Sequence, residues 1–283
     1  MIDRKLSGTP PRFPMPQGTI DTQMHMYLPD FPARDGGPGL PPLPLPTPQM
    51  YRQAMDWLGI DRVVVTQANA YQHDNDCLLA CLDDMGDVAR GVAVISPDTT
   101  EAEIEALAAA GVIGARIMDL PGGAVGLDQI GGVEPLAHAA GWMMAVQFDG
   151  SALPDLEPQL SQLRPDWVID HHAKIFDGAT QAHVDVIKRL IDRGNVWFKF
   201  AGCYESSRDG GPDFPDIAWF ARQIAEHAPE RIVWGTNWPH NGATVTEDYP
   251  NDAALIDLAL SWMPDDRARQ LALVDNPAKL YRF

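Results

Sequence analysis

The chain has 283 residues, of which 21 are Lys or Arg and 39 are Asp or Glu, so its formal net charge is −18. Such an acidic protein is poorly suited to bind nucleic acid or an anionic membrane surface, because both need clustered basic residues. Hydrophobic residues make up 45% of the sequence, which is enough for a large core and excludes global disorder.

The first segments in chain order are irregular. Residues 1–18 are rich in Pro and polar residues, and predict an N-terminal arm. One apolar strand follows, and then residues 29–48 contain so many Pro and Gly that neither a helix nor a central strand fits. A linker between two domains is one interpretation of 29–48. We favour an ordered loop within one domain that spans 1–283, because only a single strand precedes it.

Eight short apolar runs alternate with helix-length segments along the chain. The runs are typical of strands buried on both faces, and they cover residues 19–26, 62–67, 89–95, 114–120, 142–149, 167–172, 195–201 and 231–237. Three intervening segments, 99–111, 183–194 and 216–229, carry the capping residues or amphipathic patterns of helices. Eight such units in a chain of this length predict an α/β fold, a closed (β/α)8 TIM barrel. A doubly wound sheet is less suitable, since no glycine-rich phosphate motif follows a strand.

The three cysteines, Cys77, Cys81 and Cys203, are too few and too odd in number for a disulfide framework. Their scarcity favours a reducing compartment. The N-terminal residues show no apolar run typical of a signal peptide, and no stretch approaches the roughly 20 apolar residues of a membrane span. We therefore expect a cytoplasmic protein with no membrane partner.

Polar and ionisable side chains gather at the carboxyl ends of the predicted strands. Barrels of this type carry their active sites at that end. Polar side chains in apolar strands would be costly if they were buried without partners, so their clustering indicates a functional site. The candidates in chain order are Gln23, His25, Asn69, Arg116, Gln147, His171, Lys174, Lys199, Tyr204, Asn237 and His240.

The strings around these residues resemble the amidohydrolase superfamily, over nearly the whole chain. They include DTQMHMYLP, GARIMDLPGGAV, MAVQFDG, DHHAK and APERIVWGTNWPH. They are similar above all to the branch of the superfamily that converts lactones without a metal. The resemblance implies an amidohydrolase-like barrel, no cofactor, and a carboxylated sugar lactone as the small-molecule substrate.

Two departures from the metal-dependent pattern of the superfamily bear on the chemistry. The first His of a His-x-His motif on strand 1 is Gln23, and the Asp of strand 8 is Asn237. With His25 and His171, these residues offer two neutral imidazoles and two amides, a poor ligand set for a divalent ion. We therefore expect no catalytic metal. An amide at 237 also cannot activate water as a general base, so hydrolysis should be suppressed.

The resemblance implies an isomerase of hexuronate catabolism, which converts D-galactaro-1,5-lactone to the 1,4-lactone by intramolecular acyl transfer. The C4 hydroxyl would attack the C1 carbonyl, and the expected catalytic residues are His25, His171, Lys199 and Asn237. Either histidine would carry the proton. The cations would grip the free carboxylate and stabilise the oxyanion. The expected substrate-binding residues are Gln23, Asn69, Arg116, Gln147, Lys174, Tyr204 and His240.

Some choices rest on the resemblance alone or stay open. Adjacent strand residues point to opposite faces, so only one of His171 and His172 would face the interior, and we choose His171. A metal-independent hydrolase of a carboxylated lactone is an alternative function, and a non-catalytic sugar-acid binding protein is another. The sequence leaves open whether the chain forms a homo-oligomer.

Overall fold

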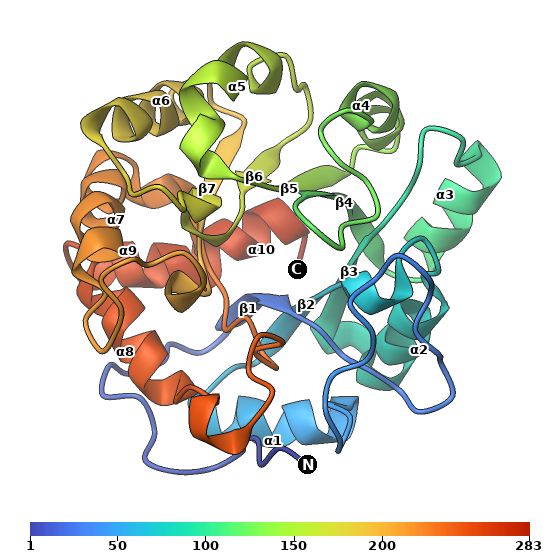
Figure 1. Ribbon diagram of the computed structural model, residues 1–283, viewed down its shortest axis with the longest axis horizontal. Helices are drawn as coiled ribbons and strands as arrows, with labels where there is room; N and C mark the ends of the chain where they lie inside the picture. The colour runs from blue at the N-terminus through green and yellow to red at the C-terminus, as the bar shows by residue number, and fades with distance from the viewer.

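The computed structural model describes residues 1–283 and confirms the predicted barrel (Figure 1). Its eight strands pair in parallel and in chain order. They are β1 (Ile20–Met24), β2 (Arg62–Thr66), β3 (Ala89–Ala93), β4 (Val112–Asp119), β5 (Met143–Phe148), β6 (Trp167–Ile169), β7 (Val196–Phe200) and β8 (Ile232–Trp234). A parallel bridge between Met24 and Trp238 joins the first and last strands and closes the barrel.

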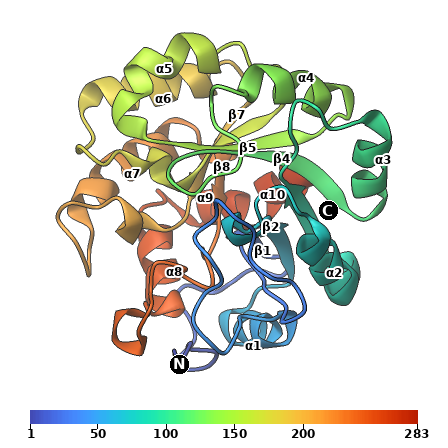
Figure 2. The ribbon, with the colours of Figure 1, turned by 45° about the vertical axis from the view of Figure 1, so that its right-hand side comes forward.

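Helices surround the strands, as Figures 1 and 2 show. They are α1 (Pro48–Leu58), α2 (Asp76–Met85), α3 (Glu101–Ala109), α4 (Ile130–Ala139), α5 (Leu153–Leu160), α6 (Gln181–Ile191), α7 (Pro215–His227), α8 (Asp252–Ser261), α9 (Asp266–Gln270) and α10 (Asn276–Tyr281). The three predicted helices are confirmed as α3, α6 and α7. At α3, Thr100 and Glu103 form the reciprocal cap that the sequence indicates. A membrane-spanning helix is not among the ten, since none has the necessary length and apolar character.

The inside of the barrel is filled in layers, because successive strand residues alternate between interior and exterior. A small apolar cluster fills the floor; it includes Val64, Val168 and Trp197, and is completed by Tyr281 of α10. Residues with the opposite orientation belong to a separate cluster of 70 buried residues, many of them on the surrounding helices. Two residues further along β2, β5 and β7, the inward side chains are polar: Thr66, Gln147 and Lys199. This layer positions the candidate site.

The irregular segments at the start of the chain are ordered and packed against each other. Arg4 of the N-terminal arm is buried and donates to the carbonyls of Pro42 and Pro44. Within the Pro-rich loop, the amide of Arg34 donates to the Ala70 carbonyl at 2.8 Å. These contacts hold the loop where residues 38–42 line the barrel mouth.

Two predicted strands extend too far. The strand predicted at 167–172 ends at Ile169, because His171–Lys174 form a 3₁₀ turn in which all four residues have positive φ angles of 46–62°. The strand predicted at 231–237 ends at Trp234, and Asn237 has a φ of 63°. Left-handed backbone cannot continue a strand ladder. The turn, rather than strand alternation, therefore sets the directions of His171 and His172.

Candidate active site

The polar layer consists of inward side chains from four neighbouring strands or their ends. Arg116 on β4, Gln147 on β5, Asp170 directly after β6 and Lys199 on β7 are all at least 96% buried. They stand two residues beyond the apolar floor, as alternation requires. His25 follows β1 at the same end of the barrel. A cavity of about 200 Å³ is lined by His25, Tyr27, Asn69, Asn241, Thr244 and residues 38–42, and Asn69 connects it to Arg116.

Lys199 lies at the base of this site and organises two neighbours. Its Nζ donates to Gln23 Oε1 at 2.8 Å and forms an ion pair with Asp170 Oδ1 at 2.9 Å. Burial alone would lower the pKa of Lys199, but the Asp170 carboxylate outweighs it and raises the pKa above its usual value. The ammonium group is therefore retained. Since Gln23 accepts through its oxygen, its amide NH₂ group is available to donate.

His25 presents a free proton acceptor. Its Nδ1 lies 2.8 Å from the Thr66 carbonyl oxygen, which can only accept, so Nδ1 carries the hydrogen. The other ring nitrogen, Nε2, is then unprotonated, and only Gln23 Nε2 lies near it, at 3.5 Å. Burial, with a smaller contribution from the positive charge of Arg116, lowers the pKa of His25 to about 3. His25 is therefore neutral across the physiological pH range.

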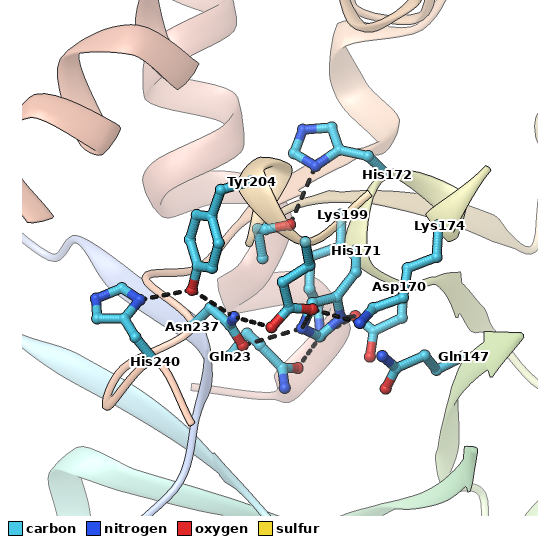
Figure 3. Close-up of polar contacts among 12 residues, drawn as sticks. Gln23, Gln147, Asp170, His171, His172, Lys174, Lys199, Tyr204, Asn237 and His240 are labelled. Atoms are coloured by element: carbon cyan, nitrogen blue, oxygen red, sulfur yellow. Dashed lines mark hydrogen bonds and ion pairs between the residues drawn. The ribbon is translucent and has the colours of Figure 1, made fainter. Parts of the chain in front are cut away.

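His171 and Asn237 form a pair on the opposite side of the site (Figure 3). Asn237 Nδ2 lies 2.8 Å from Glu205 Oε1. A carboxylate only accepts, which assigns this Asn237 atom as the NH₂ group. The amide oxygen therefore faces His171, and it accepts from His171 Nε2 at 3.0 Å. His171 Nδ1 lies 3.4 Å from Asp170 Oδ1.

A chain of hydrogen bonds extends from Asn237 into the protein (Figure 3). Asn237 Nδ2 donates to the Tyr204 hydroxyl oxygen at 2.9 Å, and Tyr204 donates to His240 Nδ1 at 2.6 Å. His240 Nε2 donates to Asp252 Oδ1 at 2.8 Å. Both His240 and Asp252 have fully buried side chains. The Asn237 NH₂ group can only donate and the Asp252 carboxylate can only accept, so these two ends set the direction of the bonds between them.

Glu205 and Lys174 form an ion pair beside Asn237. Lys174 Nζ contacts Glu205 Oε2, while Glu205 Oε1 holds the Asn237 amide. Burial alone would raise the pKa of Glu205, but His171 and Lys174 overcome this effect and lower it to about 2. Glu205 is therefore ionised, and the positive charge of Lys174 is balanced within the protein.

Arg116 differs from the two lysines, because no carboxylate forms an ion pair with it. Its guanidinium donates to the Gln67 carbonyl at 2.6 Å, to Asn69 Oδ1 at 2.8 Å and to Gln147 Oε1 at 3.1 Å. Its buried Nε has no partner. All these acceptors are neutral. Burial lowers the pKa of Arg116, but a guanidinium stays charged in proteins.

Close approach of backbone and side chains makes a glycine necessary at position 202. Gly202 follows β7 with a φ of 57°, and a Cβ atom there would lie 2.8 Å from Asn237 Nδ2 and 3.1 Å from His171 Cδ2. A side chain would therefore displace the pair that it faces. On the neighbouring strands, Asp21 accepts from the backbone amides of Gln23 and Thr236, both at 3.0 Å, which aligns β1 with the segment that carries Asn237.

The structure thus brings most predicted site residues together, but it places some behind the mouth. His240 lies behind Tyr204, and both of its ring nitrogens have protein partners, so it has no free donor or acceptor for a sugar hydroxyl. His172 stacks on Phe200 and donates from Nδ1 to the Ala201 carbonyl. Burial lowers the pKa of His172 to about 3.

Sequence reasoning did not single out Asp170, Glu205 and Asp252. Asp170 and Glu205 stand in the strand-end segments, next to selected residues, so their position was a signal that could have found them. Asp252 lies on α8, twelve residues after His240. It shows no local pattern that would connect it with the site.

The site residues do not fit a divalent metal ion. The only charged group that contacts both Gln23 and Asp170 is the Lys199 ammonium, which lies between them. The oxygen of Asn237 already accepts from His171, and His25 and Gln23 offer no negative charge. No group of three or more His, Cys, Asp or Glu side chains is arranged to hold a metal. A divalent ion would have to displace a buried ammonium group.

A larger groove of about 580 Å³ lies elsewhere, beside α2 and α3. Its ionisable lining is acidic apart from His73, and includes Asp74, Asp98 and Glu103. Its lining includes no Lys or Arg. The smaller cavity at the barrel mouth is next to Arg116, since its lining residue Asn69 accepts from the Arg116 guanidinium. It is therefore the better candidate for a negatively charged ligand.

The fold and the site together define the class of protein: a (β/α)8 barrel with a buried polar layer at the carboxyl ends of its strands. The Amidohydrolase family model matches residues 20–283, so this chain belongs to that family. The chain is 57% identical to the D-galactarolactone isomerase of Agrobacterium fabrum (strain C58 / ATCC 33970) over 282 residues, which cover 99% of this chain and 96% of that protein. It is 29% identical to the 4-sulfomuconolactone hydrolase of Hydrogenophaga intermedia, over 96% of this chain and 91% of that protein.

Solved structures agree with this assignment. An apo crystal structure of an Agrobacterium tumefaciens protein is 56% identical to this chain and superimposes with a TM-score of 0.97, with 99% of both chains covered. A probable 2-pyrone-4,6-dicarboxylic acid hydrolase from Acinetobacter baumannii, solved with citric acid bound, reaches a TM-score of 0.80 at 21% identity. It covers 94% of this chain and 100% of its own. At that identity the likeness concerns the fold alone.

Proposed function

We propose that this protein isomerises D-galactaro-1,5-lactone to D-galactaro-1,4-lactone by intramolecular acyl transfer. The observation that carries the proposal is the set of hydrogen bonds made by the Asn237 side chain. Its NH₂ group is taken by Glu205 and Tyr204, and its oxygen accepts from His171. No general base is therefore present after β8 to take a proton from water. A hydroxyl of the substrate itself replaces water as the nucleophile, and its proximity to the ester supplies much of the rate enhancement.

The reaction exchanges one ester bond for another within a single molecule. The bond between O4 and C1 forms, the bond between C1 and O5 breaks, and the proton of the C4 hydroxyl ends on O5. His25 Nε2 is the proton carrier, because the Thr66 carbonyl keeps the hydrogen on Nδ1 and His25 lines the cavity. The same imidazole then passes the proton to O5 within the turnover.

The other residues hold the substrate and its developing charge. Arg116 binds the free carboxylate, because a buried guanidinium with neutral partners needs an anion, and its planar shape suits a carboxylate. The Gln23 NH₂ group, oriented by Lys199, donates to the oxyanion. Removal of one such donor typically slows the chemical step by about 10²-fold or more. Asn69 and Gln147 orient Arg116, and they face the ring hydroxyls.

The site works without a metal or another cofactor, and we also propose a cytoplasmic location. The Lys199 ammonium supplies the positive charge that a bound ion would supply in a metal-dependent relative. All three cysteines are free thiols, as is usual in a reducing cytoplasm.

Proton NMR of freshly prepared D-galactaro-1,5-lactone tests the function. We expect the enzyme to accelerate loss of the 1,5-lactone with the 1,4-lactone as first product, and treatment with a chelator to leave the rate unchanged. An open-chain diacid as first product would instead identify a lactone hydrolase. Loss of the 1,5-lactone at the uncatalysed rate would identify a non-catalytic binding protein.

A further inference from the structure

We propose that Glu205, together with Tyr204, is a specificity-determining residue that selects an amide at position 237 and so suppresses hydrolysis. This inference rests on the proposed lactone isomerisation. It concerns the surroundings of Asn237 rather than Asn237 itself. The two residues lie in one short turn after β7, Cys203–Glu205, and both contact the same Asn237 nitrogen.

The first contact is electrostatic. Glu205 Oε1 lies 2.8 Å from Asn237 Nδ2, and the side chain of Glu205 is only 23% exposed. Its other oxygen is occupied by Lys174. Glu205 can therefore only accept a hydrogen bond from position 237. An amide provides the required donor, whereas a carboxylate would place a second negative charge about 3 Å away.

The second contact, between Tyr204 and Asn237 Nδ2, also makes the neighbour of position 237 an acceptor, but for a different reason. Tyr204 has one hydroxyl hydrogen, and it is directed at His240 Nδ1, 2.6 Å away. His240 cannot offer a hydrogen in return, because its Nε2 hydrogen is directed at the fully buried Asp252. Only lone pairs of Tyr204 thus face position 237. The buried chain from Asp252 to Tyr204 makes both neighbours of the Asn237 NH₂ group acceptors.

This arrangement predicts the fate of an aspartate at position 237. The groups that face it are His171 and Lys174 from the turn after β6, Tyr204 and Glu205 from the turn after β7, and His240 on its own segment. The Glu205 carboxylate and the Tyr204 lone pairs favour a protonated carboxyl, which donates as the amide does. A protonated carboxyl cannot take a proton from water. Asn237→Asp alone therefore gains little hydrolysis.

Neutralising Glu205 removes the negative charge next to position 237, although the Tyr204 lone pairs still face it. The side chain of Glu205→Gln can turn its NH₂ group toward an ionised Asp at 237. That carboxylate can accept a proton from water while the water oxygen bonds to C1. The bond between C1 and O5 breaks, O5 takes the proton from the carboxyl group at 237, and the product is the open-chain diacid. Hydrolysis then competes with attack by the C4 hydroxyl.

The test compares four proteins: the wild type, Asn237→Asp, Glu205→Gln, and the double variant. Each receives D-galactaro-1,5-lactone in ¹⁸O-labelled water. NMR gives the ratio of diacid to 1,4-lactone among the first products, and mass spectrometry confirms ¹⁸O in the new carboxyl group. We expect the double variant to raise this ratio at least tenfold over Asn237→Asp. Glu205→Gln alone should keep the wild-type ratio, because it still has an amide at 237.

A ratio as high in Asn237→Asp as in the double variant would overturn the inference, provided that the wild type isomerises the lactone. A wild type without isomerase activity would instead overturn the proposed function. If the double variant fails to fold, the pH profile of the single Asn237→Asp variant still tests the proposal. Its hydrolysis rate should rise at least tenfold between pH 6 and pH 9, as the carboxyl loses its proton next to Glu205, and a flat profile would contradict the proposal.

Discussion

The two halves of the barrel mouth balance their charges differently. On the side of β6 to β8, each lysine has a carboxylate partner: Lys199 pairs with Asp170, and Lys174 pairs with Glu205. On the side of β2 to β5, Arg116 has only neutral acceptors, which are amide and carbonyl oxygens and the Met118 sulfur. The cations of one half are matched by carboxylates, and the other half contains an unmatched positive charge.

This difference separates the scaffold from the binding element. Breaking a buried ion pair leaves a charge without compensation, so the paired half should contribute to the stability of the fold. An unpaired buried guanidinium is unfavourable for folding. Its presence is explained if the substrate provides the missing carboxylate. The comparison predicts that substitutions on one side reduce stability and that substitutions on the other reduce substrate binding.

The largest effect is expected at the ion pair in the polar layer. Asp170→Asn leaves the Lys199 ammonium buried without a carboxylate, which should lower the free energy of unfolding by about 3–5 kcal/mol. Denaturant unfolding measures the change. The control is Asp84→Asn, which breaks the exposed pair between Asp84 and Arg52 and should cost less than about 1 kcal/mol. Equal losses in the two variants would contradict the comparison.

Arg116→Gln should have the opposite profile. It removes the unmatched charge and keeps a donor near Asn69 and Gln147, so the free energy of unfolding should fall by no more than about 1 kcal/mol. Loss of a charged hydrogen-bonded partner for the substrate should reduce kcat/KM by about 10²-fold or more, mainly through KM. Steady-state kinetics and denaturant unfolding on the same samples check both parts. A destabilised variant with an unchanged KM would show that Arg116 is structural.

Gly202→Ala sharpens the comparison inside the paired half. The new Cβ atom meets Asn237 and His171, and the residue must keep a positive φ. We expect a loss of about 1–2 kcal/mol from backbone strain, together with a fall in kcat, because small displacements of reacting groups are costly. Gly210→Ala is the matched control, since Gly210 has a φ of 75° and no atom within 4 Å of an added Cβ. Its kcat should stay at the wild-type value.

The last effect concerns the pH dependence of stability. His25 and His172 have folded-state pKa values lowered from 6.5 to about 3, so between these values the unfolded chain binds protons that the folded chain does not. Their stabilising effect is present above pH 6.5 and is lost as the pH falls toward 3. Each contributes a slope of about 1.4 kcal/mol per pH unit. Denaturant unfolding at pH 7, 6 and 5 measures the slope. His172→Phe removes one of the two histidines and should reduce the slope by about 1.4 kcal/mol per pH unit.

The Arg116→Gln variant should also change the pH dependence of stability, through His25. The positive charge of Arg116 is one cause of the low pKa of His25. Arg116→Gln should therefore raise the pKa of His25 and reduce the slope of stability against pH between pH 3 and 4, where the folded His25 begins to bind a proton. An unchanged slope would mean that burial alone lowers the pKa of His25.

The sequence was sufficient for the barrel and for most of the residues at its mouth. Apolar runs of strand length and caps such as Thr100 are local signals, and the position of Arg116 or Lys199 near the end of such a run follows from alternation alone. The ends of two strands at Ile169 and Trp234 could not be predicted, because positive φ angles at residues such as His171 and Asn237 depend on the contacts that hold them.

Partners across the barrel required the tertiary structure. The pairs Lys199 with Gln23 and His171 with Asn237 join residues that are 176 and 66 positions apart. Nothing local encodes which polar group meets which. The kinds of functional group at the barrel mouth can be identified from the sequence of each strand by itself. Its charge balance, its proton directions and the unmatched state of Arg116 follow from packing, because hydrogen bonds and ion pairs act over only a few ångströms.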